Sequence, residues 1–588
     1  MDVRNEVNYK FEPDPDYLKK VDNSCFQIDD SFFDKFSGDT LDAIARKKVL
    51  ESLSRRTWQG TSLVTYRSDG KLLIVDHIRP DADRDRAITI ANGLAADGFN
   101  CTVLISGMEP DGPDAMLSHP LSAPNVTVVA GNLDELNGFL GQFSARLEGP
   151  RGDVNPAQPG PAGRENFDLV LDLNTPAFLQ HEVLPPGYYA PGADPEKLQS
   201  ALQEISQTTG EFSKPVYVKY QANICTHGGK GMTGCTRCLD RCPAEAIRSQ
   251  GEKIEVNTSL CQGCGSCTVA CPTGALSYAY PAVQEWLIMI RDILAAYRDA
   301  GGAQPDLLIY DAKGVAALLD HAGTLPDNLI PVPVEEIGSV GMDAWLSTLA
   351  YGAGTIALLI GKETPPSILA GLQAQFSVTH SLLKGMGYAE DRLRLIVVNA
   401  DNTFAVSDKS GKYSDQHPAA GFNPFEKRVS IRMALGHLYQ YAPKPQEVTA
   451  LPPGAPFGEI QVDQNTCTLC MSCVAICPVK ALQHDVNQLQ LGFLESNCVQ
   501  CGLCRNVCPE NSITLVSRYL YDDKLASKPR IVNEDKPFCC IACGKPFISR
   551  RMFDRIAEKL AAAGNWKVDK KVTPDWLQMC GDCRIKKN

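Results

Sequence analysis

The spacing of the cysteines constrains this chain more than any other feature. The chain has 588 residues, of which 23 are cysteine. Cys25 and Cys101 stand alone, and the others fall into three islands at 225–271, 467–508 and 539–583. Short, regular spacings within each island are typical of metal ligands rather than of disulfide partners. Metal chemistry is therefore expected at three places, separated by segments with another role.

The expected cellular compartment also favours metal ligands over disulfides. The first twenty residues are polar and lack the apolar segment of a signal peptide. No apolar run approaches the roughly 18 residues that cross a bilayer. We therefore expect a cytoplasmic protein, in which thiols stay reduced and free to bind metals. The net charge of −12 argues against nucleic-acid binding and favours redox protein partners with a basic face.

The second island contains the clearest motif. CTLCMSCVAICPVKAL and CVQCGLCRNVCPENSI each space their cysteines as C-x2-C-x2-C-x3-C-P. In this motif three thiolates hold one [4Fe–4S] cluster and the fourth ligates the neighbouring cluster. One predicted ligand set is Cys467, Cys470, Cys473 and Cys508. The other is Cys498, Cys501, Cys504 and Cys477.

The first island repeats this design with one alteration. CQGCGSCTVACPTGAL is regular, but nine residues, THGGKGMTG, separate Cys225 from Cys235 in the other run. The crossing rule predicts one set of Cys225, Cys235, Cys238 and Cys271, and a second set of Cys261, Cys264, Cys267 and Cys242. The four glycines of the insertion would let the backbone bulge outward without moving Cys225, which is the least secure ligand.

Both islands resemble bacterial two-cluster ferredoxin domains, over about 55 residues each. The resemblance lies in the cysteine spacing and in the CP pair that opens each helix start, as in CPAEAI, CPTGAL, CPVKAL and CPENSI. It implies clusters close enough for rapid electron exchange and no bond-making chemistry. Structural zinc sites are the weaker interpretation, because zinc motifs lack the third and fourth cysteine with its proline.

The third island differs. Two CxxC pairs, Cys540 with Cys543 and Cys580 with Cys583, flank a helix predicted over 550–563. Four thiolates at this spacing favour a closed tetrahedral zinc site with a structural role. A mononuclear iron site or a fifth cluster stays open, the latter because of Cys539.

The segments before the first island and between the first and second islands are predicted to be α/β structure. Apolar strands are predicted at 71–77, 100–106, 125–131 and 167–174, and again at 306–312, 328–334, 355–361 and 392–400. The second group predicts a four-stranded parallel sheet. No G-x-G-x-x-G or G-x-x-x-x-G-K-[ST] motif marks a nucleotide site.

Three further residues are interpreted without a ligand role. Cys25 and Cys101 are expected to be ordinary buried thiols, the latter within a strand. His227, in the nine-residue insertion, is expected to be a solvent-exposed loop residue rather than a ligand or proton relay.

The predicted fold class is multidomain α/β: parallel α/β domains combined with two dicluster-ferredoxin-like α+β modules and a C-terminal zinc-knuckle-like segment. The expected boundaries are an arm at 1–60, an α/β domain at 61–215 with a linker at 149–166, a module at 216–282, a cysteine-free α/β domain at 283–445, a module at 446–525 and a metal-binding segment at 526–588.

These features favour an electron-transfer protein with four [4Fe–4S] clusters and one zinc. Polyferredoxin-like chains of this style resemble electron-wiring subunits of larger redox complexes, such as a formate dehydrogenase. We expect a non-catalytic carrier. The alternatives are a catalytic oxidoreductase subunit, with an unmarked flavin or substrate site in an α/β domain, and an iron–sulfur regulatory or assembly protein.

Overall fold

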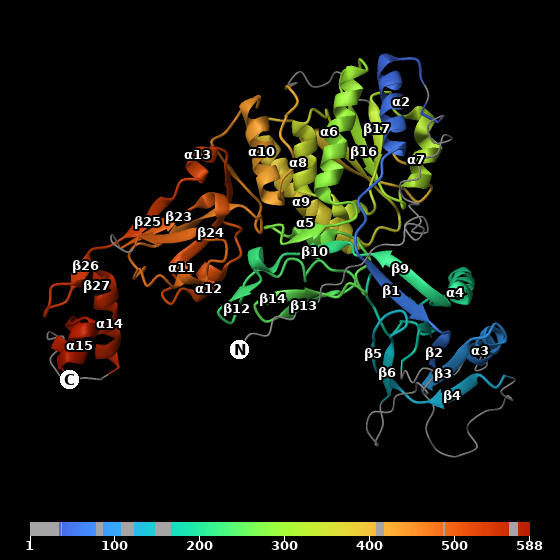
Figure 1. Cartoon of the computed structure of the whole chain (residues 1–588), viewed down its shortest axis with the longest axis horizontal. Coiled ribbons are helices and arrows are strands. Elements are labelled where there is room, and N and C mark those ends of the chain that lie inside the picture. The colour runs from blue at the N-terminus through green and yellow to red at the C-terminus, as the bar shows by residue number, and fades with distance from the viewer. Residues whose placement is uncertain are drawn as a thin grey trace, which may run out of the picture.

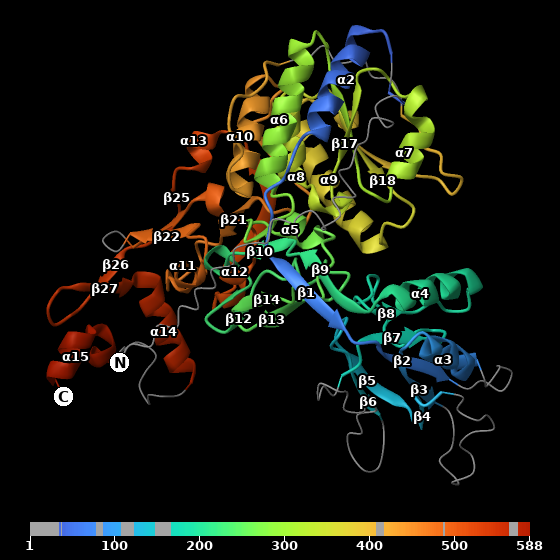
Figure 2. The same cartoon turned by 45° about the vertical axis from the view of Figure 1, so that its right-hand side comes forward.

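The protein is described by a computed structural model (Figures 1 and 2). Its described residues are 35–36, 38–77, 86–106, 123–147, 166–406, 417–485, 489–563 and 574–587. Cys25, most of the predicted arm and nearly all of the predicted linker at 149–166 lie outside these residues. No helix among them is long and apolar enough to cross a membrane.

The first α/β unit is a five-stranded parallel sheet in the order β4-β3-β2-β7-β8. Its strands are β2 (Lys71–His77), β3 (Asn100–Ser106), β4 (Val126–Ala130), β7 (Leu169–Asp172) and β8 (Tyr188–Tyr189). The four predicted strands are present, and β8 is an addition. Helices α3 (Arg86–Ala96) and α4 (Pro195–Gln207) cover one face, and the hairpin of β5 (Leu133–Asn137) and β6 (Ser144–Leu147) covers the other.

A two-stranded ribbon joins this unit to the first cysteine island. Strand β1 (Leu63–Ser68) pairs antiparallel with β9 (Gly210–Pro215). Lys214 on β9 donates hydrogen bonds from Nζ to the carbonyls of Ser259 (2.9 Å) and Cys261 (2.7 Å). The hydroxyl of Tyr66 on β1 donates to the same Ser259 carbonyl at 2.6 Å. The ribbon therefore supports the backbone that leads into the Cys261 loop.

The second α/β unit is the predicted four-stranded parallel sheet, in the order β17-β16-β18-β19. The strands are β16 (Asp306–Tyr310), β17 (Leu329–Pro333), β18 (Ile356–Ile360) and β19 (Leu393–Val397). The helices around it are α6 (Val283–Asp299), α7 (Val315–His321), α8 (Met342–Ala350), α9 (Pro366–Met386) and α10 (Lys427–Gln440). Central strand residues are buried on both faces, as a parallel sheet covered on both sides requires.

One helix of the predicted N-terminal arm belongs to this second unit. Helix α2 (Leu41–Ser54) places Val49 and Leu50 in the core beside α6. Its buried Arg46 donates to the carbonyl of Pro326 at 2.7 Å and pairs with Asp327 at 3.3 Å. The arm is therefore packed against a domain that follows it by more than 200 residues, a long-range contact that local sequence does not reveal.

The first cysteine island folds as a small α+β module, which we call module 1. Its elements are β10 (Val218–Tyr220), η1 (Ala222–Ile224), β11 (Gly228–Gly229), β12 (Met232–Thr233), β13 (Ile247–Gln250), β14 (Lys253–Val256), α5 (Ser266–Ala270) and β15 (Leu276–Tyr278). Strands β10 and β15 pair at one end, and β13 pairs with β14. The nine-residue insertion forms the β11–β12 hairpin.

The second cysteine island, module 2, has a similar plan with longer strands. Its elements are β20 (Val448–Ala450), β21 (Gly458–Val462), α11 (Ser472–Ile476), β22 (Leu482–Asp485), β23 (Gln490–Phe493), η5 (Glu495–Asn497), α12 (Leu503–Val507), β24 (Ile513–Leu520), α13 (Asp523–Ala526) and β25 (Arg530–Glu534). Tyr519 of β24 and Tyr521, which follows that strand, pack into the core of the second α/β unit. Module 2 is therefore anchored to that unit.

The C-terminal segment forms a compact end piece. Strands β26 (Pro537–Cys539) and β27 (Pro546–Ser549) pair, followed by α14 (Arg550–Ala562), η6 (Asp575–Gln578) and α15 (Gly581–Lys587). Helix α14 matches the helix predicted over 550–563. In both Figure 1 and Figure 2 this segment, module 2 and module 1 follow one another, with the second α/β unit above the modules.

Candidate iron–sulfur centres

In module 1 the structure brings together Cys225, Cys235, Cys238 and Cys271, which line one cavity. Burial, followed by repulsion from the other three thiols, raises the pKa of Cys238 to about 12. The shared cavity places the four cysteines together. The nine-residue insertion therefore leaves Cys225 beside the other three.

The remaining cysteines of module 1 form a second set. Cys267 is buried, and this burial is the main cause that raises its pKa well above the usual value. Charge on Cys264, Cys261 and Cys242 adds to the shift, in that order. The last of these comes from the other run, as the crossing pattern requires.

Module 2 repeats both arrangements. Cys467, Cys470, Cys473 and Cys508 line a second cavity. Burial raises the pKa of Cys473 to about 12, with repulsion from the other three members of its set.

The fourth set gathers around Cys504. Burial raises the pKa of Cys504, followed by repulsion from Cys498, Cys501 and Cys477. The sixteen cysteines of the two modules are thus placed in four groups of buried or half-buried thiols, two of which line cavities. Four thiolates buried together need a bound cation, so these donor sets fit iron–sulfur clusters.

The backbone after each CP pair also fits this role. The third residue after the fourth cysteine of each run has a left-handed conformation, with φ of 48°, 76°, 53° and 50° at Glu245, Gly274, Lys480 and Asn511. This turn aims the next amides at sulfur. The N–H groups of Ala246 and Ser512 each lie 3.3 Å from the Sγ of the cysteine four residues earlier. Such bonds stabilise the anionic sulfur and set cluster potential.

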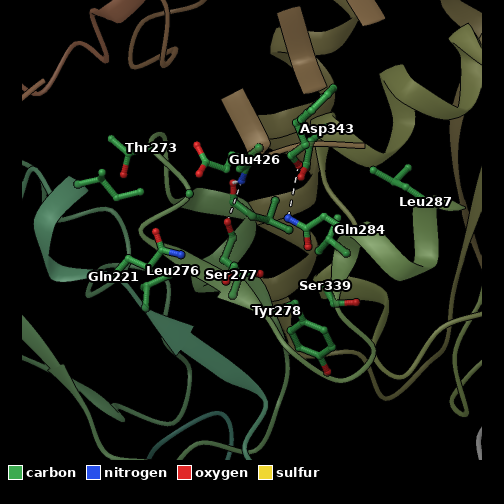
Figure 3. A pocket seen from close by; sticks show the side chains of 17 residues that line it. Gln221, Thr273, Leu276, Ser277, Tyr278, Gln284, Leu287, Ser339, Asp343 and Glu426 are labelled. Atoms are coloured by element: carbon green, nitrogen blue, oxygen red, sulfur yellow. Dashed lines mark hydrogen bonds between the residues drawn. The ribbon is translucent and has the colours of Figure 1, made fainter. Parts of the chain in front are cut away.

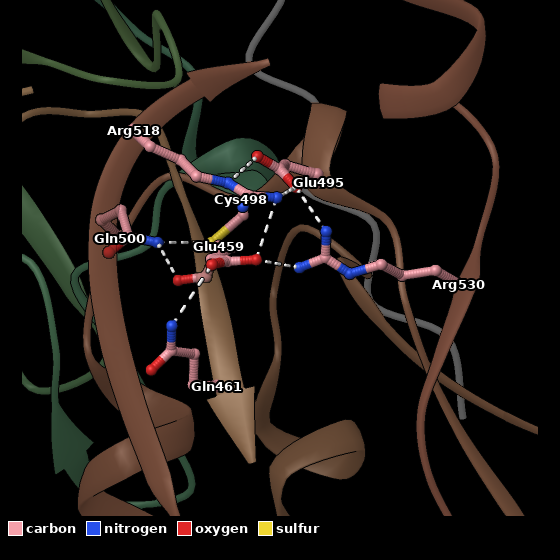
Figure 4. A network of polar contacts seen from close by, with 7 residues as sticks. All are labelled: Glu459, Gln461, Glu495, Cys498, Gln500, Arg518 and Arg530. Carbon is pink, nitrogen blue, oxygen red and sulfur yellow. Dashed lines mark hydrogen bonds and ion pairs between the residues drawn. The ribbon is translucent and has the colours of Figure 1, made fainter. Parts of the chain in front are cut away.

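Charged side chains support the Cys498 loop (Figure 4). Glu495, with 8% of its side chain exposed, accepts hydrogen bonds from Arg518 at 2.8 and 3.0 Å and from Arg530 at 2.9 Å. Glu459 pairs with the same two arginines at 2.9 and 2.6 Å. Beside this network, Gln500 donates from Nε2 to Cys498 Sγ at 3.4 Å. Among the residues of this network, Gln500 donates a side-chain hydrogen bond to the Cys498 sulfur.

The expectation for His227 is wrong. The side chain is buried, with 2% exposed, rather than open to solvent. Its Nδ1 lies 2.9 Å from the carbonyl of Cys235, and its Nε2 lies 2.7 Å from Ser249 Oγ. Because a carbonyl only accepts, Nδ1 donates, and in the neutral ring Nε2 then accepts from the Ser249 hydroxyl. The ring thus fixes the base of the insertion to the Cys235 loop, a role that the many glycines around it concealed.

At the C-terminus, Cys540, Cys543, Cys580 and Cys583 hold sulfur atoms within 4.8 Å of one another. Cys539 is exposed and does not belong to this group. Burial opposes ionisation of Cys540, but hydrogen bonds from the amides of Cys580, Ala542 and Cys543 outweigh it and lower the pKa of Cys540 to about 6. A thiolate favoured in this way is a ready metal ligand. The donor set fits a metal bound by four cysteines.

Within the part of the chain that the structure describes, Cys101 belongs to none of these thiol groups. It is buried in β3, and burial raises the pKa of its thiol to about 12. This agrees with an ordinary core thiol.

Two supporting residues escaped the sequence reasoning because they lie in the cysteine-free segment. Lys427 and Arg428 open α10, and their side chains reach the two modules. Two basic residues at the start of a helix do not indicate, from the sequence alone, that their side chains contact other domains.

Comparisons with known proteins agree with the modules. A 4Fe-4S binding domain matches residues 254–277, and a 4Fe-4S dicluster domain matches residues 459–509. The second match includes all eight cysteines of module 2, whereas the first covers only the Cys261–Cys271 run.

Three relatives are similar over short stretches. Hydrogenase-4 component A of Escherichia coli is 50% identical over 40 residues, which is 7% of this chain and 20% of that protein. Two uncharacterized ferredoxins of Methanocaldococcus jannaschii are 34% identical over 58 residues (10% of this chain, 32% of the relative) and 40% identical over 43 residues (7% and 69%). The chain thus spans a third or less of the first two relatives. From the two domain matches and the ferredoxin relatives, the chain belongs to the iron–sulfur proteins with 4Fe–4S ferredoxin-type domains.

Proposed function

We propose that this iron–sulfur electron-transfer protein holds four [4Fe–4S] clusters, two in each module. The observation that carries the proposal is the convergence of sixteen buried or half-buried cysteines into four groups, two of which line cavities. The ligand sets are Cys225, Cys235, Cys238 and Cys271; Cys242, Cys261, Cys264 and Cys267; Cys477, Cys498, Cys501 and Cys504; and Cys467, Cys470, Cys473 and Cys508.

A bound [4Fe–4S] cluster takes up or releases one electron without making a bond. The chain's own residues would hold the iron, exclude water and adjust the potential. Exclusion of water comes from the apolar side chains around each set, such as Ile254 and Leu276 in module 1 and Leu491 and Ile513 in module 2. The amide and side-chain donors to sulfur make reduction easier by stabilising the added negative charge.

Iron analysis of anaerobically purified protein tests the proposal. We expect about sixteen iron atoms and as many sulfide ions per chain. About eight or fewer would contradict the four-cluster proposal. Since Cys101 lies in no thiol group, Cys101→Ala is the matched control and should leave the iron content unchanged.

We propose a structural zinc ion for the C-terminal group of four cysteines. Four thiolates leave no open coordination position for a substrate. Ser549, at the start of the helix between the two CxxC pairs, donates to the Thr468 carbonyl at 2.7 Å, so the segment is tied to the Cys467 loop. Metal analysis identifies the bound metal. One zinc per chain supports the proposal, whereas one iron beyond the sixteen would indicate a mononuclear iron site and four would indicate a fifth cluster.

We further propose that the chain is an electron-wiring subunit of a larger redox complex. The similarity to hydrogenase-4 component A supports this, and a formate dehydrogenase is the other type of complex that we consider. Affinity purification of the tagged chain from its native cells, under anaerobic conditions, should recover a catalytic oxidoreductase subunit. Recovery of the chain without any redox protein would count against membership in a complex.

One observation favours a second candidate function, that of a catalytic oxidoreductase subunit. A cavity of about 550 Å³ lies between module 1, α9 and the Pro452–Pro456 segment, and Arg237 and Arg241 line it. Two cations beside a cluster loop would suit an anionic flavin or substrate. A flavin absorbance in the purified protein would favour this function, and a spectrum of iron–sulfur clusters alone would favour the carrier.

A further inference from the structure

The nine-residue insertion of module 1 reaches toward module 2. Its base is closed by the amide of Cys235, which donates to the Thr226 carbonyl at 3.0 Å, and by that of Gly234, which donates to the His227 carbonyl at 2.6 Å. We call residues 226–234 the junction hairpin. The buried ring of His227 holds it against Cys235 and Ser249, so the hairpin is a fixed extension of one cluster loop.

The outer side of the junction hairpin packs on the two cluster-bearing helices of module 2. A Cβ atom placed on Gly234 would lie 2.6 Å from Cγ of Leu503, the first residue of α12. A Cβ on Gly229 would lie 3.6 Å from Ile476, the last residue of α11. Leu503 and Ile476 are buried, with 1% and 4% exposed. Glycine at 234 is therefore what allows the modules to approach so closely.

A second contact holds the modules from the side of the second α/β unit. Lys427 donates from Nζ to the carbonyls of Thr268 (2.8 Å) and Val269 (2.7 Å), both in α5 of module 1. Next to it, Arg428 donates to the carbonyls of Ser496 (3.0 Å) and Cys498 (2.5 Å) in module 2. We call Lys427 and Arg428 the clasp.

The clasp residues lie at the start of a helix that is packed into the protein core. The helix that it opens, α10, is packed into the core through Ile431, Ala434 and Leu435. Lys427 also lines a pocket at the border of module 1 and the second α/β unit, together with Thr273 and Gln284 (Figure 3). Both modules are thus held by adjacent residues of one rigid helix.

These contacts bring one thiol set of each module face to face. Gly234 directly precedes Cys235, and the two residues that the hairpin meets, Leu503 and Ile476, directly precede Cys504 and Cys477 of the Cys501 set. Within each module the two sets are neighbours, because each run of the proposed pattern gives its fourth cysteine to the other set. The four sets therefore follow one another in a row, with the Cys235 and Cys501 sets in the middle.

We propose that the junction hairpin and the clasp join the two modules in series, so that electrons pass between the Cys235 set and the Cys501 set. This inference rests on the proposed four clusters. In the step, the cluster of one module is oxidised by one electron while the cluster of the other is reduced by one, and no bond forms or breaks. External one-electron donors and acceptors then exchange with the outer sets, at Cys261 and Cys467.

The test uses the full chain, reduced anaerobically, and electron paramagnetic resonance. In the wild type we expect three interactions between neighbouring reduced clusters, two within the modules and one across the junction. Gly234→Val places a branched side chain against Leu503 and should abolish the third interaction while the iron content is retained. Gly229→Ala, which meets Ile476 at ordinary contact distance, is the matched control.

A size exchange shows that the effect comes from separation of the modules. Adding Leu503→Ala to Gly234→Val creates room for the new side chain and should restore the third interaction. If Gly234→Val loses iron, the pair Lys427→Met with Arg428→Met tests the junction from the other side. Arg432→Met is its control, because Arg432 lies one turn further along α10 and pairs with the exposed Asp523.

The outcomes separate this inference from the proposed function. The series arrangement would be overturned if the wild-type spectrum were fully described by two independent pairs of clusters. It would also be overturned if the Gly234→Val and clasp variants kept their iron and gave the same spectrum as the wild type. In either case the iron content of about sixteen would still support four clusters. An iron content of eight or fewer would remove the proposed function itself.

Discussion

Replacement of Gln500 by leucine should lower the potential of one cluster and leave the others unchanged. The amide of Gln500 donates from Nε2 to Cys498 Sγ at 3.4 Å and to the Glu459 carbonyl at 3.1 Å. Leucine keeps the size of the side chain and removes the donor. The backbone tolerates this change, because Gln500 has φ 55° and the equivalent residue of the preceding run, Leu469, has φ 54°.

The size of the effect follows from the energy of the lost bond. A hydrogen bond to a charged group contributes about 1.5–3 kcal/mol, and the bond strengthens when reduction adds negative charge. If about 1 kcal/mol of this energy is specific to the reduced state, the potential falls by about 40 mV, since a tenfold change in a one-electron equilibrium is about 59 mV.

A potentiometric titration followed by electron paramagnetic resonance measures the shift. The control is Gln461→Leu, which removes an exposed amide that contacts Glu459 but no sulfur atom (Figure 4). We expect a fall of roughly 20–60 mV for one cluster in Gln500→Leu and none in the control. An unchanged or raised potential, with the iron content intact, would refute the assignment of this amide as a donor to a cluster ligand.

Three other predictions concern the ligands and their support. Cys508→Ala should destroy or convert the cluster of Cys467, Cys470 and Cys473 and spare its neighbour, as iron analysis and spectroscopy would show; loss of the neighbour instead would mean that the crossing is wrong. Glu495→Gln should lower the stability of module 2 by about 2 kcal/mol, less than the 3–5 kcal/mol for a broken buried pair because Glu459 still pairs with both arginines. Anaerobic thermal unfolding would record a decrease of roughly 8–16 °C in the midpoint of module 2, and an unchanged midpoint would contradict the network's role. Removal of 540–588 should cost the bound zinc and leave the iron content intact, whereas loss of four irons would reveal a fifth cluster.

The parts of the fold that depend on local sequence could be predicted. Apolar runs gave the parallel strands of both α/β units, because strands buried on both faces need continuous apolar residues. The grouping of thiols could be anticipated for a similar reason: a ligand loop such as Cys467–Cys473 is short, and its spacing alone decides which sulfur atoms can meet. Whether iron binds there stays a prediction until it is measured.

The contacts between units could not be predicted, since they join residues far apart in the chain. Arg46 meets Asp327 across 281 residues, and Lys427 meets Val269 across 158. The burial of His227 depends on Ser249 in another strand, so its glycine-rich surroundings pointed to solvent. An apparent irregularity in the Cys225 run likewise proved to be the contact between the modules, which neither run alone indicates.

The proposed function requires four one-electron centres in one chain. A coulometric titration of the oxidised, anaerobic protein with a low-potential reductant counts the electrons that each chain accepts. We expect about four electrons per chain, one for each cluster, with the absorbance of the oxidised clusters bleached in proportion. Uptake of about two electrons by iron-replete protein would contradict it.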